Sequence, residues 1–279
     1  MIVTVTLNAA VDRTLTVPNF QFGHRHRASH SLTSAGGKGI NVARALKRLE
    51  TPVVASGLAG GRTGDRIVEE LALEGILNDF VRISDESRTS IAVVDPTAGS
   101  LPRDVDNDFY ATAIRDLNRR GVQCVLDCEG EPLRLGVEAE PFLVSPNQGE
   151  AESLVGQEFS DEEDFVMALD TIADLGARNV LITQETSCFG LFREERQVRR
   201  FRASIARIEP VAPVGAGDVL LAGFLAARFN GRPIDEALRN GVACAAASVL
   251  ELGAGRFDPK EAARLSAGVE LQELEKTPA

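Results

Sequence analysis

A glycine-rich turn that ends in an aspartate is the segment of this chain best suited to chemistry. Gly215-Ala216-Gly217-Asp218 runs directly into an apolar segment with helical spacing. Two glycines let the backbone turn tightly, and the first N–H groups of the following helix lack partners within it. Together with the positive end of the helix dipole, these donors form an anion site. Asp218 is either a base that takes a proton from a hydroxyl attacking a phosphoryl group, or a simple helix cap.

A second glycine turn lies near the start of the chain. Ala35-Gly36-Gly37-Lys38-Gly39 opens a helix that the pattern predicts over residues 39–49. Gly39 stands where a Walker loop has Ser or Thr, and the spacing of a dinucleotide fingerprint is absent. Backbone N–H groups, Lys38 and Asn41 would instead suit a polyhydroxylated ligand. The alternative is an ordinary helix entry with an exposed lysine.

Short β-branched runs alternate with helical patterns along the chain. Strands are expected at residues 2–7, 52–58, 89–95, 122–127, 142–145, 180–183 and 190–192. Helices are expected at residues 39–49, 64–74, 106–120, 161–175, 218–229 and 234–251. This alternation predicts an α/β fold with a mainly parallel sheet covered on both faces, and sites in such sheets gather at the carboxyl ends of the strands. Residues 270–279 are expected to be a frayed tail.

Composition limits the functions open to this chain. Its 279 residues, 44% of them hydrophobic, can bury the core of one large domain. A net charge of −11 argues against a nucleic-acid or membrane surface. Because Met1 leads straight into a strand pattern, we expect no signal peptide and a cytoplasmic protein. The four cysteines lack zinc spacing and are expected to be reduced thiols, and no metal site is expected at His24, His26 and His30.

The combination of motifs and their order is more specific than any single motif. Asp12, the Gly-Gly-Lys-Gly turn, Arg88-Thr89-Ser90-Ile91, Gly99-Ser100-Leu101-Pro102, Pro146-Asn147-Gln148-Gly149-Glu150 and the Asp218 motif follow one another. From Met1 to about Asp258 the chain resembles the PfkB branch of the ribokinase-like sugar kinases, and within it the 1-phosphofructokinase and tagatose-6-phosphate kinase group. Ala9 stands where that family usually has proline. The resemblance implies one three-layer α/β/α domain over residues 1–279, with a mainly parallel sheet and a small, incomplete β-lid at about 8–35 and 88–97.

The resemblance also implies a role for each matching residue. Asp218 would be the catalytic base, and the turn Gly215, Ala216 and Gly217 would bind the transferring phosphoryl group. The residues implied in sugar binding are Asp12, Gly37, Lys38, Asn41, Arg88, Arg27 and Ser100. Among them, Arg88, Lys38 and Arg27 would neutralise the phosphate already on the sugar. The residues implied in nucleotide binding are Asn147, Thr183, Gly190, Gly215, Gly217, Gly253 and Gly255, with Glu150 holding magnesium through water. The alternative for Asn147 and Glu150 is a helix-capping pair.

The implied reaction is the ATP- and Mg²⁺-dependent phosphorylation of a phosphorylated ketohexose. The expected substrate is fructose 1-phosphate, which would become fructose 1,6-bisphosphate. Two alternatives stay open: a tagatose-6-phosphate kinase, and a degenerate kinase fold that binds a sugar phosphate without turnover. The expected partners are the sugar phosphate and ATP, with no nucleic acid and no membrane. A homodimer formed through the lid is a further option, which the sequence does not decide.

The sequence departs from the family pattern directly after the lid strand. Ile91–Thr97 is followed almost at once by the Gly-Ser-Leu-Pro motif, whereas relatives have a lid segment, a helix and a core strand between them. A parallel crossover needs about a dozen residues or more, so Ala98 alone cannot replace it. Either the sequence omits a stretch that the protein contains, or the protein has lost it. Omission is favoured, because losing a central strand should unfold the sheet; Thr97, Ala98 and Gly99 are then expected to be discontinuous or unusually connected.

A second departure concerns the nucleotide turn. Thr183–Gly190 stands where the wider family has a glycine-containing turn, and only Gly190 is suitably placed. Glu185 adds negative charge near the expected polyphosphate, so nucleotide affinity is expected to be weaker or the loop to differ in shape. The turn Gly253-Ala254-Gly255 would flank the adenine, although a helix C-cap also explains it.

Overall fold

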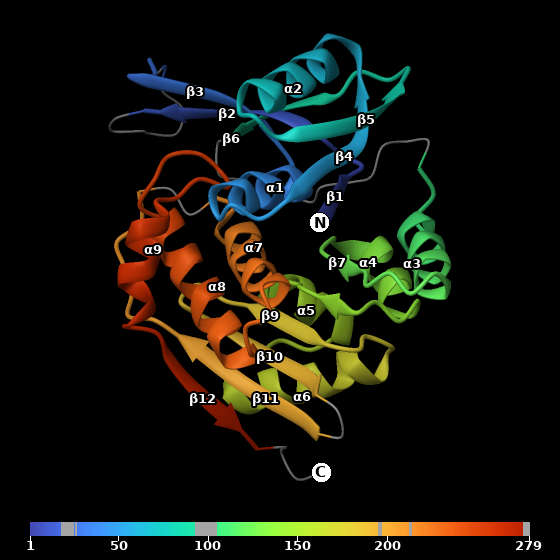
Figure 1. Cartoon of the computed structure of the whole chain (residues 1–279), viewed down its shortest axis with the longest axis vertical. Helices are drawn as coiled ribbons and strands as arrows, with labels where there is room; N and C mark the ends of the chain where they lie inside the picture. Colours follow the sequence, from blue (N-terminus) through green and yellow to red (C-terminus); the bar gives the residue numbers. More distant parts are fainter. Residues whose placement is uncertain (18–24, 26, 93–104, 195–196, 212–213, 276–279) are drawn as a thin grey trace. The chain divides into compact units, whose positions relative to one another are not determined.

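The computed structural model describes residues 1–17, 25, 27–92, 105–194, 197–211 and 214–275 (Figure 1). The chain divides into two compact units. The first consists of Met1–Pro102, Ile208–Ala226 and Cys244–Ala262, and the second of Arg103–Arg207, Ala227–Ala243 and Ala263–Ala279. The single domain over residues 1–279 stays a prediction.

The first unit contains two small sheets. In one, β1 (Ile2–Thr6), β4 (Val53–Gly60) and β5 (Leu77–Ile83) pair in parallel in the order β1-β4-β5. In the other, β2 pairs antiparallel with β3 and parallel with β6, which gives the order β3-β2-β6. The strands of this second sheet are β2 (Ala10–Thr16), β3 (His30–Gly36) and β6 (Arg88–Ala92). They occupy the two segments in which the lid was expected.

Two helices link the parallel strands of the first unit. α1 (Lys38–Arg48) packs on β1 and β4, and α2 (Gly61–Leu73) packs on β4 and β5. Each helix buries one apolar stripe, with Ile40 and Leu46 in α1 and Ile67 and Leu71 in α2 having no exposed surface. α1 begins at Gly37, whose φ of 115° is one that side-chain-bearing residues avoid. The glycine pair therefore ends β3 and starts α1 within two residues.

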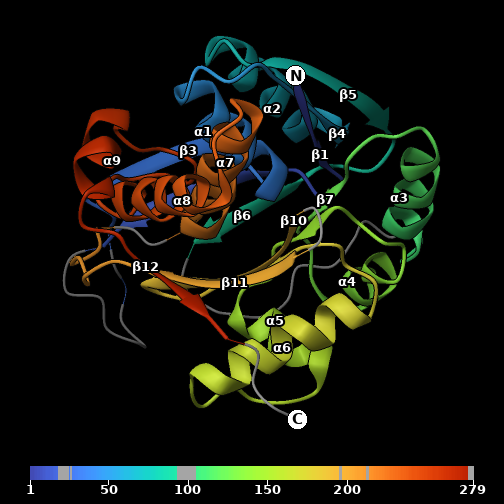
Figure 2. The same cartoon turned by 60° about the horizontal axis from the view of Figure 1, so that its bottom comes forward.

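The second unit is built on a six-stranded sheet in the order β12-β11-β10-β9-β8-β7. The parallel strands are β7 (Val125–Leu126), β8 (Leu143–Val144) and β9 (Val180–Thr183). The antiparallel strands are β10 (Ser187–Glu194), β11 (Gln197–Ser204) and β12 (Glu270–Leu274). Figure 2 shows α5 (Gln148–Val155) and α6 (Glu162–Asp174) on one face of this sheet. Phe165 of α6 stacks on Phe189 of β10, with ring centroids 4.3 Å apart, at the centre of this core.

The remaining helices complete the two units. α3 (Phe109–Arg119) and α4 (Gly130–Val137) belong to the second unit. α7 (Ala216–Phe229), α8 (Ile234–Ser248) and α9 (Pro259–Ser266) each contribute residues to both. Within the described part of the chain, no helix is both long and apolar enough to cross a membrane.

The tail was expected to be frayed, and this prediction is wrong for its first half. Glu270–Leu274 forms β12, which pairs antiparallel with β11. The strand is held by its ladder and by Arg199, whose guanidinium donates two hydrogen bonds of 2.9 Å to Glu273. A charged edge strand lacks a strong hydrophobic pattern, so periodicity did not reveal it.

β1 has one strand partner, β4, among the described residues. Its side chains alternate, because Thr4 and Thr6 are 7% and 6% exposed whereas Val3 and Val5 are 53% and 51% exposed. Among the described residues, the hydroxyls of Thr4 and Thr6 have no hydrogen-bond partner. Strand β1 therefore presents apolar side chains and an edge without a partner in the described chain. The expectation about Thr97, Ala98 and Gly99 lies outside the described residues.

We expect Val5→Lys to lower self-association of the protein. A lysine on an edge strand disfavours pairing with a second chain, and an exposed position tolerates it with a change of about 0.5 kcal/mol or less in the free energy of unfolding. Light scattering over a range of concentrations and urea unfolding measure the two effects. Thr4→Lys on the buried face of the same strand is the control and should unfold the protein. Unchanged association of Val5→Lys would contradict the importance of this edge.

Candidate active site

Asp218 lies in the first turn of α7 and is 8% exposed. Its Oδ2 accepts a hydrogen bond of 2.8 Å from Nδ2 of Asn41, which lies in α1. The helix starts after Gly215, whose φ of 81° lies in the left-handed region. A Cβ at Gly215 would lie only 2.9 Å from the Cβ of Ala254. The fold thus joins two glycine-started helices that are far apart in the sequence.

The turn that contains Gly253 and Gly255 lies against the same two elements. Its glycines have φ values of 104° and 74°, and a Cβ at Gly255 would come within 2.6 Å of the carbonyl oxygen of Asn41. Glycine is needed here because the turn passes directly over the backbone of α1. α8 ends at Ser248, so Gly253 is too far along the chain to cap it. The alternative interpretation of this turn as a helix C-cap is wrong.

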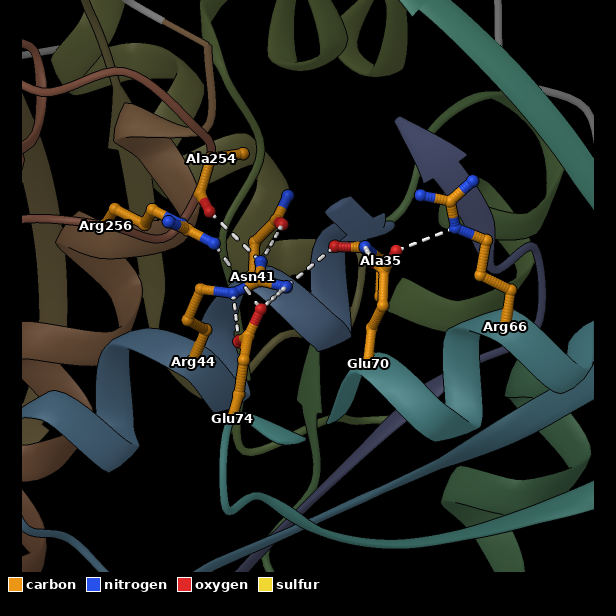
Figure 3. A network of polar contacts seen from close by, with 8 residues as sticks. All are labelled: Ala35, Asn41, Arg44, Arg66, Glu70, Glu74, Ala254 and Arg256. Carbon is orange, nitrogen blue, oxygen red and sulfur yellow. Dashed lines mark hydrogen bonds and ion pairs between the residues drawn. The ribbon is translucent and has the colours of Figure 1, made fainter. Parts of the chain in front are cut away.

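A buried arginine that sequence reasoning missed holds this arrangement together (Figure 3). Arg44 of α1 is 3% exposed. Its Nη2 donates to the carbonyl of Ala35 at 2.8 Å, and its Nη1 donates to the carbonyl of Ala254 at 3.1 Å and to Oδ1 of Asn41 at 3.3 Å. Its Nε donates to Oε2 of Glu74 at 2.6 Å. The sequence did contain a signal for this role. Arg44 is a charged residue inside the apolar stripe of the helix predicted at residues 39–49, and a buried cation needs partners.

Asp12 lies on the small sheet that contains β2, opposite Ser34 of β3 and Ser90 of β6. Arg88 is opposite Ala10, two residues earlier, so Arg88 and Asp12 share a face of this sheet. Burial raises the pKa of the Asp12 carboxyl above its ordinary value, while the charges of Arg88 and Arg44 act in the opposite direction. Asp12 is therefore a partly buried acid whose charge is influenced by two arginines.

Gly36 leaves the space that the Asp12 carboxylate occupies. A Cβ at Gly36 would lie 1.8 Å from Oδ2 of Asp12. Gly37 and Lys38 follow at once, at the start of α1. The fold thus brings together, within the first unit, most of the residues that the resemblance implied in sugar and phosphoryl binding: Asp12, Gly37, Lys38, Asn41, Arg88, Gly215, Ala216, Gly217 and Asp218.

Arg27, which was also implied in sugar binding, is not brought into this group in the described part of the chain. Arg27 is exposed, and its side chain has no interaction with the other candidates in the described part of the chain. Ser100 lies outside the described residues.

The second unit holds Asn147, Thr183 and Gly190 of the residues implied in nucleotide binding, and Glu150, which is implied in magnesium binding. Asn147 is the N-cap of α5, where its Oδ1 accepts from the Glu150 N–H and Glu150 accepts from the Asn147 N–H, both at 2.9 Å. The capping pair named as the alternative is therefore present. Asn147 also forms a parallel bridge with Thr183 at the end of β9. These three residues thus gather at the carboxyl ends of two neighbouring parallel strands.

The expected place of Gly190 in a nucleotide turn is wrong. Gly190 lies inside β10, paired with Leu181 and Phe201, and a Cβ there would meet the ring of Phe192 at 2.4 Å. Glycine is required at this position by aromatic packing. The negative charge of Glu185, which was expected near the polyphosphate, is paired with Arg207 at 2.9 Å.

The donor set at Asn147 and Glu150 fits a hard cation. A carboxylate has about four lone-pair sites and an amide oxygen has two, so acceptors within a capping box keep further capacity. Magnesium prefers such oxygens and usually keeps several waters. The described residues contain no group of three or more His, Cys, Asp or Glu side chains placed to hold a metal. All four cysteines are free thiols, as expected.

Comparisons with known proteins identify the family of this chain. The profile of the pfkB family carbohydrate kinases matches residues 3–99 and 96–261. The chain is 30% identical over 286 residues to a 1-phosphofructokinase of Borreliella burgdorferi, with 90% of this chain and 92% of that protein covered. It is 31% identical over 293 residues to a 1-phosphofructokinase of Bacillus subtilis, with 92% and 96% covered. The crystal structure of phosphofructokinase-2 from Escherichia coli in complex with potassium is similar in fold, with a TM-score of 0.84 and 25% identity over 95% of this chain and 98% of that one.

The family match breaks where the sequence pattern breaks. Its two matched ranges overlap at residues 96–99 instead of forming one continuous match. The comparison with the B. burgdorferi protein spans 286 positions but includes about 251 residues of this chain, which is 90% of 279. Roughly 35 positions of that protein therefore have no counterpart here. The expected ribokinase-like α/β fold and the sugar-phosphate kinase class are both confirmed. The chain belongs to the pfkB family of carbohydrate kinases.

Proposed function

We propose that this kinase transfers the γ-phosphoryl group of ATP to fructose 1-phosphate, with Asp218 as the catalytic base. The observation that carries the proposal is the 2.8 Å hydrogen bond between Asn41 and Asp218. It joins the turn suited to a sugar to the turn suited to a phosphoryl group. The names of the B. burgdorferi and B. subtilis relatives support the substrate.

The sugar phosphate is bound by the group around Asp12. The partly buried carboxylate of Asp12 accepts hydrogen bonds from sugar hydroxyls, and the amide of Asn41 binds a further hydroxyl. Arg88 and Lys38 neutralise the phosphate already on the sugar, because a guanidinium fork matches phosphate oxygens. The protein carries a net charge of −11, so this local positive charge is what makes an anionic substrate acceptable.

The transfer step needs a base beside an anion site. The attacking hydroxyl oxygen forms a bond to the γ-phosphorus, ADP leaves, and the hydroxyl proton passes to the carboxylate of Asp218. The N–H groups of the Gly215–Gly217 turn bind the transferring phosphoryl oxygens at the start of α7. Most of the rate enhancement comes from positioning and electrostatics rather than from the strength of the base.

Asn147, Thr183 and Glu150 are proposed to bind the nucleotide phosphates and Mg²⁺, Glu150 through water. When bound, Mg²⁺ offsets the negative charge of the ATP phosphates. A role of Gly253 and Gly255 in nucleotide binding stays a prediction from the family resemblance. A homodimer through the β3-β2-β6 sheet stays a prediction from the family resemblance.

Two alternatives are separated by one experiment. Tagatose 6-phosphate differs from fructose 1-phosphate in the position of the phosphate and in the configuration at C4. The edge of β1 and the break at residues 96–99 are the observations behind the other alternative, a fold that binds without turnover. An ADP-release assay against a panel of sugar phosphates distinguishes them. Fastest turnover of fructose 1-phosphate is expected. Preference for tagatose 6-phosphate would change the substrate, and binding without ADP release would remove the kinase reaction.

Asp218→Asn is expected to lower kcat by about 10²- to 10⁴-fold, because it removes the proton acceptor. The amide keeps the size of the side chain, so the KM for ATP should change little. Steady-state kinetics at saturating sugar phosphate measure both constants. Turnover equal to that of the wild type would contradict the role of Asp218.

Arg88→Ala is expected to raise the KM for the phosphorylated sugar by about tenfold or more, because a charge-assisted contact to phosphate is lost. The KM for ATP should be unaffected. The matched control is Arg82→Ala, which removes an exposed arginine of β5 that pairs with Asp65. A defect confined to ATP would show that Arg88 does not bind the sugar phosphate.

Asp12→Asn is expected to stabilise the protein at neutral pH while weakening sugar binding. Because burial raises the pKa of Asp12, its ionised form lowers the free energy of unfolding above the raised pKa, and this cost disappears as the pH falls below the ordinary value of 3.8. The gain in stability should therefore shrink between pH 7 and pH 4. Urea unfolding at both pH values measures it, with the exposed Asp79→Asn as a control that should show no gain. A variant less stable than the wild type at pH 7 would contradict the argument.

A further inference from the structure

A hollow of about 300 Å³ lies at the far end of α1 from Lys38. Its lining is dominated by cations from two parts of the chain: Arg44, Lys47, Arg48, Glu74, Ile76 and Arg256. Four positive side chains face one carboxylate, which is unusual in a chain with 30 basic and 41 acidic residues. All of these residues belong to the first unit.

The single carboxylate is shared by two arginines. Arg44 donates to both oxygens of Glu74, at 2.6 and 3.2 Å, and Arg256 approaches the same carboxylate at 3.6 Å (Figure 3). Arg48 has a carbonyl acceptor, that of Phe257, at 2.8 Å. Since a carbonyl carries no net charge, these contacts leave the hollow with a formal charge of +3.

Lys47 adds its ammonium at the edge of the hollow. The residue is exposed, and its Cε would lie 3.9 Å from a Cβ at Gly75, the residue after Glu74. Cations in the last turn of a helix also stabilise the helix dipole, and this accounts for the position of Lys47 and Arg48. It does not account for Arg256, which comes from the 253–257 loop and turns toward the same hollow.

The hollow is separate from the proposed transfer site. A helix rises 1.5 Å per residue, so Arg48 lies about 15 Å further along α1 than Lys38. A phosphate bound by Lys38 and Arg88 cannot reach across that distance. Arg44 lies between the two sites, because it lines the hollow and also donates to Oδ1 of Asn41.

We propose that this hollow is a second binding site, which takes a small phosphate-bearing anion. Guanidinium groups suit phosphate because their N–H donors match two oxygens at once. The volume is at the lower end of the range of small-molecule sites, which fits an anion such as pyrophosphate or a sugar phosphate. Bound anion would offset the excess positive charge that Glu74 alone does not balance.

The test is calorimetric titration of the full chain with inorganic pyrophosphate. The wild type is expected to show binding that is retained in Arg88→Ala, where the proposed sugar-phosphate cation is absent. Lys47→Gln and Arg256→Gln are each expected to weaken that binding by about tenfold. Arg120→Gln, which removes one exposed positive charge from the second unit, is the control and should bind as the wild type does.

Each outcome decides the question. Loss of binding in Lys47→Gln and Arg256→Gln but not in Arg120→Gln supports the site. Binding that is equal in all variants, or no binding by the wild type, overturns it. Loss only in Arg88→Ala also overturns it, because the anion then binds where the sugar phosphate is proposed to bind. Lys47 is exposed, so Lys47→Gln keeps the fold and gives a result even if Arg256→Gln unfolds.

Discussion

The arrangement of the first unit depends on the buried guanidinium of Arg44, which needs hydrogen-bond acceptors from the protein because it is shielded from water. The Arg44 guanidinium donates hydrogen bonds to Ala35 at the end of β3, to Ala254 in the 253–255 turn, and to Glu74 at the end of α2. A buried charge without such partners would cost several kcal/mol. Because Arg44 also binds Asn41, the structural network ends on the amide that contacts Asp218. The stability of this unit and the position of the proposed base therefore have the same physical origin.

Local signals predicted the starts of the two key helices, because a glycine turn followed by an apolar stripe depends on few neighbours. Asp218 and Lys38 accordingly lie in the first turns of α7 and α1. The contacts between these helices could not be predicted in the same way, since the Asn41–Asp218 bond joins residues 177 positions apart. Strand β12 and the role of Gly190 were missed for a related reason: each depends on cross-strand neighbours rather than on its own pattern.

The break after the lid strand has a physical counterpart in β1. A parallel strand in the middle of an α/β sheet is normally paired on both sides and covered on both faces. In the described chain β1 pairs with β4 alone, and Val3 and Val5 are half exposed. The family match breaks at residues 96–99, in the part of the chain where the family resemblance implied a further strand. Four of the residues proposed to bind the sugar phosphate, Asp12, Lys38, Asn41 and Arg88, lie before this break, in β2, α1 and β6.

Because Gly36 lies so close to the Asp12 carboxylate, a substitution at position 36 could alter the proposed sugar site without unfolding the protein. A side chain there would meet the tip of a flexible carboxylate rather than backbone, so the strand could stay in place while the carboxylate turned away. A substitution that weakens the fold lowers the abundance of a protein in the cell, because chaperones and proteases remove the unfolded fraction. A substitution of Gly36 would act differently. It would displace the Asp12 carboxylate from the proposed sugar site, while the fold and the cellular abundance of the protein would be kept. Homologues with a larger residue at this point are where a non-catalytic branch of the family would first be sought.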